Sequence, residues 1–352
     1  MTLFNDYNMI FLNKLDLQGR SKHVDVMKGL GMLCVVAGHI YSGFTSELIY
    51  VFHMPLFFFI SGSLFNKKEN LKQYFETKAV HFLIPYLSFL LIFHFGLNLP
   101  KLVSDSSDGI FQYIYSGIVG GETLHGHTGV FWFVTCLFIT QQIANYIMVK
   151  CHNVRLLLIV AILLCVSYVN SLFFPNYYLP WSLNVVFAAL PIFLIGYLYN
   201  KKIRINTLFL LGCLAIIIII VLKYEGFSYD MKNAQYGIPF ATLLGSLLMI
   251  FLIKNLAQLI SKNQSVILYI LVETGRSSMI IMYLHQPIQI ITNRFISTDP
   301  TFRFLFSTLI SYVFYLFFLR FSLTRALFLG NKNDFFKIKS RFSNMSKITG
   351  SV

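Results

Sequence analysis

The chain has 352 residues, of which 56% are hydrophobic, 17% are aromatic and only 12% are charged. This composition excludes an ordinary soluble domain, in which roughly a quarter of the residues are charged, and indicates an integral membrane protein. The formal net charge of +14 is compatible with a nucleic-acid partner until the positions of the basic residues are considered. Five cysteines occur without C-x-x-C or paired Cys/His spacing, so we predict no metal site.

Stretches long and apolar enough to cross a bilayer follow one another along the chain. A spanning helix needs about 20 mainly apolar residues, and ten stretches fit: 24–43, 50–66, 80–98, 130–149, 156–173, 181–199, 205–222, 236–253, 265–293 and 303–323. We therefore expect an all-α fold, a polytopic membrane helix bundle of about ten transmembrane helices. The predicted divisions are an N-terminal segment 1–23, a membrane domain 24–323 and a basic tail 324–352.

Basic residues gather in every second loop between these spans. With a cytoplasmic N-terminus, twenty of the 28 Lys and Arg residues fall on inner segments, five on outer segments and three within helices. The positive-inside rule then predicts that both termini are cytoplasmic. The charge thus reports membrane sidedness, and we predict membrane lipids but no nucleic acid as partners. The longest outer loop, residues 99–129, offers an acceptor-facing surface, with a solvated flexible loop as the simpler alternative.

The first span, which contains MKGLGMLCVVAGHI at 27–40, carries Lys28 near one end and His39 near the other. Eleven residues at about 100° each leave a net rotation of roughly 20°, which places both side chains on one helix face about 16 Å apart. Ionisable groups at membrane depth usually face a protein interior or a wet cavity. For Lys28, a lysine that only anchors the helix at the membrane surface is the alternative.

Other polar residues reach the same depth as His39 under this topology. His53 begins the second span, His285 lies late in the ninth, and Trp132 begins the fourth, just after Glu122 in the preceding loop. A histidine near neutral pH can act as a general base when a second group orients it. Each histidine alone has a structural hydrogen-bonding role as its alternative, and the shared depth favours a catalytic role for His39.

Several segments carry a resemblance to a known family. They are HVDVMKGLGMLCVVAGHI (23–40), with Lys-x10-His as Lys28 and His39, FHMPLFFFISGSLF (52–65), FLIPY (82–86), FWFVTCLF (131–138) and GRSSMIIMYLHQPI (275–288). With these motifs the chain resembles the membrane-bound acyltransferase-3 family, especially the sugar O-acetylases related to fucose O-acetylase. It departs from many relatives at KAVH, Lys78 to His81, where they carry an Arg-x-x-Arg pair.

The resemblance implies an O-acyltransferase of the bacterial cytoplasmic membrane with no permanently bound cofactor. It would use acyl-CoA, usually acetyl-CoA, to acylate a hydroxyl of a glycan or a lipid-linked glycan, with His39 as the base and Lys28 on the donor. We predict catalytic roles for His39, His285 and Glu122, donor-binding roles for Lys28, Lys78 and Arg276, and acceptor-binding roles for His53 and Trp132. A direct transfer and an acyl-histidine relay both fit these residues.

A transporter or flippase for a lipid-linked glycan is the rival interpretation, because many carriers also combine about ten helices with buried charge. Carriers of this kind often show repeat symmetry and broken helices in matching positions, and the sequence has no clear internal repeat. A purely structural membrane protein explains poorly why several polar groups share one depth. Release of CoA thiol separates an enzyme from a carrier.

Overall fold

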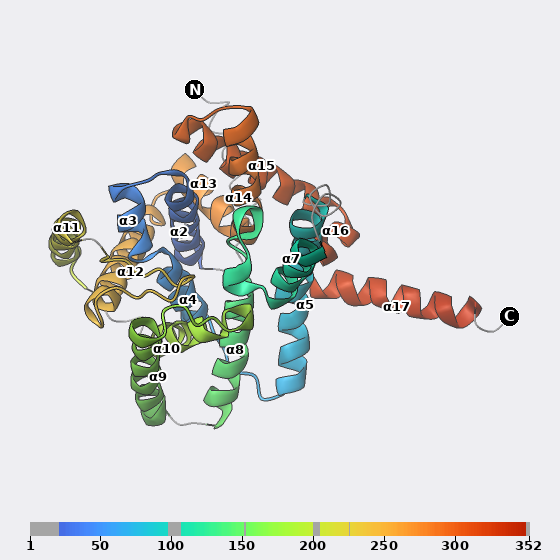
Figure 1. Ribbon diagram of the computed structural model, residues 1–352, viewed down its shortest axis with the longest axis horizontal. Coiled ribbons are helices and arrows are strands. Elements are labelled where there is room, and N and C mark those ends of the chain that lie inside the picture. Colours follow the sequence, from blue (N-terminus) through green and yellow to red (C-terminus); the bar gives the residue numbers. More distant parts are fainter. Residues whose placement is uncertain (1–20, 98–106, 151–152, 200–204, 225, 350–352) are drawn as a thin grey trace.

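The protein is a bundle of helices in the computed structural model (Figure 1). The model describes residues 21–97, 107–150, 153–199, 205–224 and 226–349, and within these ranges it contains no β-strand, only an isolated bridge between Asp230 and Gln235. The prediction of an all-α fold is therefore confirmed for the described chain. Residues 1–20 of the predicted N-terminal segment lie outside it.

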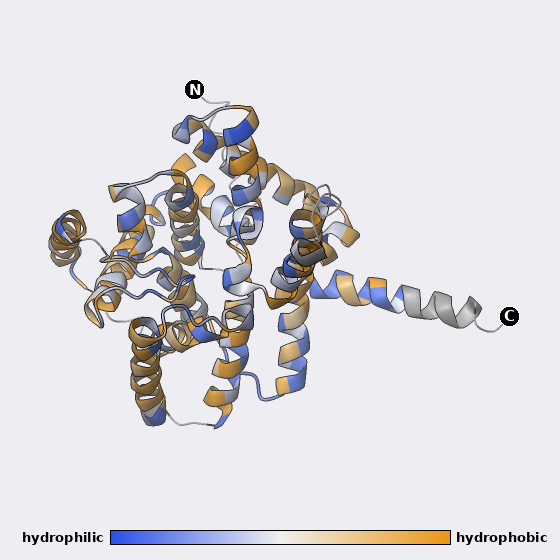
Figure 2. Cartoon of the chain, viewed as in Figure 1, coloured by the Kyte–Doolittle hydropathy of each residue, from blue (hydrophilic) through white to orange (hydrophobic). Residues whose placement is uncertain are grey.

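Long apolar helical segments account for eight of the ten predicted spans, and a bent helix pair accounts for a ninth. Four of the eight are single α-helices or part of one: Lys22–Ile40 (α2), Arg155–Phe173 (within α9, Asn153–Phe173), Ala241–Ile260 (α12) and Pro300–Arg320 (α15). The other four each combine two helices: Phe44–Ser63 (α3, Phe44–Tyr50, and α4, His53–Ser63), Leu71–Gly96 (α5, Leu71–Leu90, and η1, Leu91–Gly96), Gly126–Lys150 (η3, Gly126–Thr128, and α8, Trp132–Lys150) and Pro180–Leu198 (η4, Pro180–Val185, and α10, Val186–Leu198). Helices α13 (Val266–Arg276) and α14 (Ser278–Phe295) add a bent pair, and the shorter apolar α11 (Thr207–Lys223) coincides with the remaining predicted span. Figure 2 shows apolar residues along the helices of the bundle. The chain is a multi-pass membrane protein.

Three polar regions differ from the loops that the hydropathy pattern predicts. Helix α5 begins at Leu71, where the Asn70 side chain caps the backbone N–H of Gln73, so Lys78 lies on a helix and not in a loop. The predicted loop 99–129 contains α7 (Ser107–Val119), while its residues 98–106 lie outside the described chain. The predicted tail forms α16 (Ser322–Phe328) and α17 (Lys332–Thr349), which projects from the bundle in Figure 1. A search for apolar runs misses such helices because they are polar or short.

Helix α2 packs very closely against α13. A Cβ on Gly29 would lie 2.1 Å from the backbone oxygen of Leu271, and a Cβ on Gly275 would lie 2.0 Å from the backbone oxygen of Asp25. Each distance is far below an ordinary contact of at least 3.4 Å. The two helices therefore approach each other through glycine on both sides, as small residues allow in membrane bundles. This contact fixes the position of the helix that carries Lys28 and His39.

The ninth predicted span is not a straight helix, because the chain turns by 82° between α13 and α14. Ser277 lies at the break, and its hydroxyl donates to the backbone oxygen of Glu273 at 2.7 Å. The turn lets α13 pack along one part of α2 while α14 contacts another part of the same helix. His285, on α14, is thereby brought to the His39 end of α2.

Candidate active site

One face of α2 is lined by cavities along most of its length. Lys28, Met32, Val35 and His39 follow one another at spacings of four, three and four residues, which is the repeat of a single helix face. All four line one of two neighbouring cavities. The prediction that Lys28 and His39 share a helix face is therefore confirmed, because α2 runs unbroken from Lys22 to Ile40.

The first cavity, called the Lys28 cavity here, has a volume of about 650 Å³ and lies between α2, α4, α5, α8 and α14. Its charged lining comprises Lys28, Lys68, Lys78 and one acid, Glu69. Asp25, which is buried, lies 3.9 Å from the Lys28 ammonium. The volume falls in the range of small-molecule sites, and the net positive lining suits an anionic ligand.

Polar side chains join the helices around this cavity. The Gln141 side chain on α8 donates to the Ser61 hydroxyl on α4 at 2.8 Å and accepts from the Tyr74 hydroxyl on α5 at 3.4 Å. Asn145, one turn further along α8, accepts from the backbone N–H of Lys68 at 2.8 Å and donates to its carbonyl at 2.9 Å. These bonds hold the α4–α5 connection, and with it Lys68, at the cavity rim.

The second cavity, called the His39 pocket, has a volume of only about 80 Å³. His39, His53 and Trp132, which the sequence assigned to the reaction site, all line it. The two cavities share a wall of four side chains, namely Met32, Phe57, Phe133 and Met282. The Phe57 and Phe133 rings meet edge to face with their centroids 5.9 Å apart. A ligand in the Lys28 cavity is thus one layer of apolar side chains from His39.

Aromatic and imidazole rings form a chain across the His39 pocket. The ring centroids of His39 and His285 are 5.4 Å apart, those of His39 and Tyr50 are 6.3 Å apart, and those of Tyr50 and His53 are 4.8 Å apart. His285 is fully buried and is not among the residues that line the pocket, so it lies behind His39 as seen from the cavity. It is placed to contact His39 and not a ligand.

Backbone contacts define the tautomers of two of these histidines. Nδ1 of His285 lies 2.7 Å from the carbonyl oxygen of Ile281, and Nδ1 of His53 lies 3.0 Å from that of Ile49. A carbonyl oxygen only accepts, so Nδ1 carries the proton in both rings and Nε2 of the neutral ring is an acceptor. Nε2 of His285 is buried and has no hydrogen-bond partner among the described residues. A buried acceptor of this kind is costly unless a donor reaches it.

Two predicted site residues lie elsewhere. Arg276 ends α13 and donates to the Glu273 carboxylate at 2.9 Å, and the Tyr312 hydroxyl donates to the same carboxylate at 3.2 Å. Arg276 lines neither cavity. Glu122 lies on the short helix η2 (Gly121–Thr123), 4.0 Å from Nε2 of the exposed His125, and does not line the His39 pocket. The roles assigned to both residues stay predictions.

The sequence reasoning missed the polar segment that closes the His39 pocket. Asp230, Lys232 and Asn233 line the pocket beside Tyr50, and the backbone N–H of Tyr229 donates to the Tyr50 carbonyl at 3.0 Å. The short polar run between the predicted spans 205–222 and 236–253 was the available signal, since it falls on the same side as His39.

Lys232 is held in place by several groups. Its ammonium donates to the Leu124 carbonyl at 2.9 Å, which ties this segment to the loop that contains Glu122. Burial lowers the pKa of Lys232 below its usual value, while the carboxylates of Glu122 and Asp230 act in the opposite direction. The Asp230 carboxylate in turn accepts from the Asn233 side chain at 2.8 Å. The pocket therefore presents both a carboxylate and an ammonium near the imidazoles.

Comparison with known proteins decides the family. The model of an acyltransferase domain, that of the acyltransferase-3 family, matches residues 22–322, which is most of the chain and includes both cavities' linings up to Met282. The chain belongs to the acyltransferase-3 family. No curated protein and no solved structure matches the chain in the corresponding comparisons. The protein is a membrane acyltransferase, and its branch within the family is addressed below.

Membership gives the two cavities a common interpretation. An acyltransferase must bring an acyl donor and an acceptor together, and this chain has two cavities on one face of α2 that share four lining side chains. His39 lies on one side of that wall and Lys28 on the other. The arrangement suits group transfer between ligands that enter from opposite ends of the helix.

Proposed function

We propose that this acyltransferase transfers an acetyl group from acetyl-CoA to a sugar hydroxyl of a surface polysaccharide or its lipid-linked precursor, in a bacterial cytoplasmic membrane. The observation that carries the proposal is the pair of cavities on one face of α2, one large and basic around Lys28 and one small and rich in imidazole around His39. The resemblance of the sequence motifs to sugar O-acetylases related to fucose O-acetylase supports the choice of acetyl and of a sugar.

The Lys28 cavity is the donor site in this proposal. Its lysines would bind the phosphates of CoA from the cytoplasmic side, as charge-assisted hydrogen bonds. The pantetheine arm is neutral and slender, and it would reach the wall formed by Met32, Phe57, Phe133 and Met282. Two of these four side chains are methionines, which are flexible and adapt to a ligand. The thioester would then face His39.

His39 would act as the general base. The acceptor hydroxyl gives its proton to one ring nitrogen of His39 as its oxygen attacks the thioester carbonyl carbon. The C–S bond then breaks, and the CoA sulfur takes the proton from His39, so that an ester and free CoA are formed. The other ring nitrogen of His39 would donate to Nε2 of His285, which the structure leaves as a buried acceptor. His285 is in this scheme a positioning residue.

Acetylation of the surface glycan tests the function. We expect deletion of the gene to remove acetyl groups from the surface polysaccharide, as read by mass analysis of the repeat unit. The wild-type gene restores them, whereas His39→Ala does not, although the variant protein accumulates normally in the membrane. Lys337→Ala is the control, because Lys337 is exposed and lines neither cavity.

Purified protein gives a second readout of the same proposal. Wild-type protein with acetyl-CoA and the glycan isolated from the deletion strain should release CoA thiol, and the His39→Ala variant should release about 100-fold to 10,000-fold less, the range that general acid–base catalysis contributes. Retained acetylation by His39→Ala would remove the role of His39. Glycan transport without thiol release would overturn the proposed reaction.

A further inference from the structure

The chain continues past the matched acyltransferase domain as a helical hairpin that folds back onto α5. The domain match ends at residue 322, and α16, the turn after it and α17 follow. The Phe328 ring on α16 stacks on Phe318 with a centroid distance of 4.4 Å and lies 5.1 Å from the Phe89 ring on α5. This C-terminal hairpin is thus packed against α5, one of the helices that line the Lys28 cavity.

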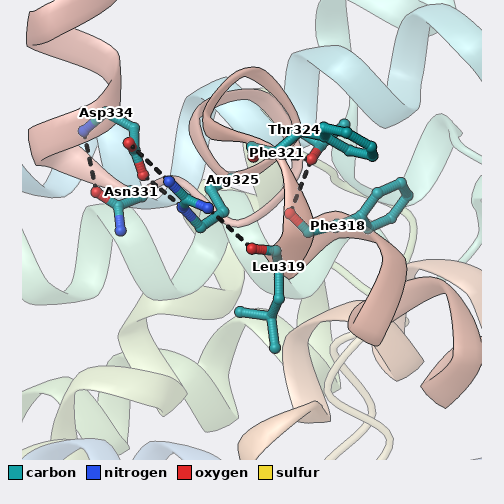
Figure 3. A network of polar contacts seen from close by, with 7 residues as sticks. All are labelled: Phe318, Leu319, Phe321, Thr324, Arg325, Asn331 and Asp334. Carbon is teal, nitrogen blue, oxygen red and sulfur yellow. Dashed lines mark hydrogen bonds and ion pairs between the residues drawn. The ribbon is translucent and has the colours of Figure 1, made fainter.

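Polar contacts fix the shape of the hairpin (Figure 3). Arg325 on α16 donates to both carboxylate oxygens of Asp334 on α17, from Nε at 2.7 Å and from a terminal nitrogen at 3.1 Å. Its other terminal nitrogen donates to the Leu319 carbonyl at 2.9 Å. The Asn331 side chain accepts from the backbone N–H of Asp334 at 3.1 Å, which caps α17. A bidentate arginine–carboxylate pair fixes the relative orientation of the two helices as well as stabilising their contact.

The turn of the hairpin packs directly against the backbone of α5. Gly330 has a φ of 59°, and a Cβ at this position would lie 2.4 Å from the backbone oxygen of His81. Only glycine combines this backbone conformation with so close an approach. The two residues that follow, Asn331 and Lys332, are therefore held at a fixed place beside the α5 turn that contains Thr77, Lys78 and His81.

A further cavity opens between this turn and α5. This Lys332 cavity has a volume of about 530 Å³, and Thr77, Lys78 and His81 line both it and the Lys28 cavity. The ammonium of Lys332 donates to the Thr77 hydroxyl at 2.8 Å, and that hydroxyl donates to the Gln73 carbonyl at 2.8 Å. The residues that line the Lys332 cavity include two lysines and no carboxylate. Among the described residues, Lys332 makes no ion pair.

We propose that Lys332 and Lys78 form an anion subsite at the end of the Lys28 cavity next to the start of α17, and that they bind the phosphates of the nucleotide end of the acyl donor. The inference rests on the proposed use of acyl-CoA, and it assigns donor binding to a residue outside the acyltransferase domain. In this proposal Lys332 supplies a positive charge that is missing from the KAVH segment, where many relatives carry two arginines. Two lysines from different helices supply the positive charge, although not the two-pronged contact of a guanidinium.

Direct binding of CoA to the full-length protein in detergent tests the subsite, by calorimetry with CoA and with 3′-dephospho-CoA. We expect Lys332→Met to weaken CoA binding about tenfold, as loss of one charge-assisted hydrogen bond predicts. Lys332→Arg keeps the charge and should bind nearly as wild type. Lys337→Met is the matched control, because Lys337 is exposed on the same helix and lines none of the three cavities.

Comparison of CoA with 3′-dephospho-CoA identifies which phosphate the subsite binds. If Lys332→Met weakens CoA alone, the subsite holds the 3′-phosphate, and if it weakens both ligands, the subsite holds the diphosphate; either result supports the proposal. Equal CoA binding by wild type and Lys332→Met overturns the subsite while leaving the proposed function in place. If wild-type protein does not bind CoA at all, both the proposed use of acyl-CoA as donor and the proposed subsite are overturned. Unchanged thermal unfolding of Lys332→Met excludes misfolding as the cause of weaker binding.

Discussion

The contact between His39 and His285 yields a prediction that separates positioning from packing. His285 keeps Nδ1 protonated through the Ile281 carbonyl at 2.7 Å and leaves Nε2 as a buried acceptor without a partner among the described residues. A glutamine at this position places its amide oxygen near the site of Nε2. An asparagine reaches only the site of Nδ1, so it can still donate to Ile281 but offers His39 no acceptor.

We therefore expect His285→Asn to lose far more activity than His285→Gln. A hydrogen bond to a group that becomes charged in the reaction is worth about 1.5–3 kcal/mol, which corresponds to a fall in kcat of roughly 10- to 100-fold at about 1.4 kcal/mol per tenfold. Steady-state thiol release gives kcat and KM for each variant, and KM for the donor should hold steady because His285 lines neither the Lys28 cavity nor the His39 pocket.

The pH dependence of kcat distinguishes the two roles, because loss of a purely structural residue would leave it unchanged. If His285 orients His39, the limb of the pH–kcat profile that reports protonation of the base should move along the pH axis in His285→Asn. In His285→Gln it should stay near its wild-type position. Equal kcat values for the two variants would refute the reasoning, because both remove the same ring and differ only in which nitrogen site they replace. Thermal unfolding of both variants provides the stability control.

Two further predictions concern the fold. Gly275→Ala places a Cβ 2.0 Å from the Asp25 carbonyl oxygen, so it should lower stability by about 1–3 kcal/mol in thermal unfolding, whereas Gly212→Ala, where nothing lies within 4 Å, should not; equal effects would contradict the close packing. Arg325 lowers the pKa of Asp334 below its usual 3.8, so its contribution is present at neutral pH and is lost as the pH falls through the lowered pKa. Asp334→Asn should therefore unfold at a lower temperature than wild type at neutral pH, and the difference should shrink as the pH falls below 3.8 and vanish below the lowered pKa. Coincident unfolding curves at neutral pH would argue against the pair.

Local regularity explains what could be predicted from the sequence. The common face of Lys28 and His39 depends only on the helical repeat, and α2 is a continuous helix, so simple spacing was sufficient. Eight of the ten apolar stretches correspond to helical segments long enough to cross a membrane for the same reason, because hydropathy is a property of each segment alone. His53 and Trp132 also reached the pocket, since the depth of a residue follows from its distance to the end of its span.

The remaining site residues depend on how distant segments fold back, and no local pattern contains that information. Asp230 and Lys232 reach the His39 pocket because their loop is bonded to Tyr50. Lys332 reaches Thr77, which lines the Lys28 cavity, through a glycine turn in what the composition shows only as a basic tail. Arg276 was expected to bind the donor, and its ion pair with Glu273 arises at a break between helices that hydropathy does not reveal.

The four side chains between the cavities have a consequence for the membrane itself. A hydrocarbon core is about 30 Å thick, and along α2 the two cavities are separated by a single layer of side chains, namely Met32, Phe57, Phe133 and Met282. All four are apolar, so they exclude water and ions from the path between the cavities. In the proposed reaction the acyl group has to cross this same layer, so these four side chains would both admit the acyl group and separate the two aqueous ends of the path.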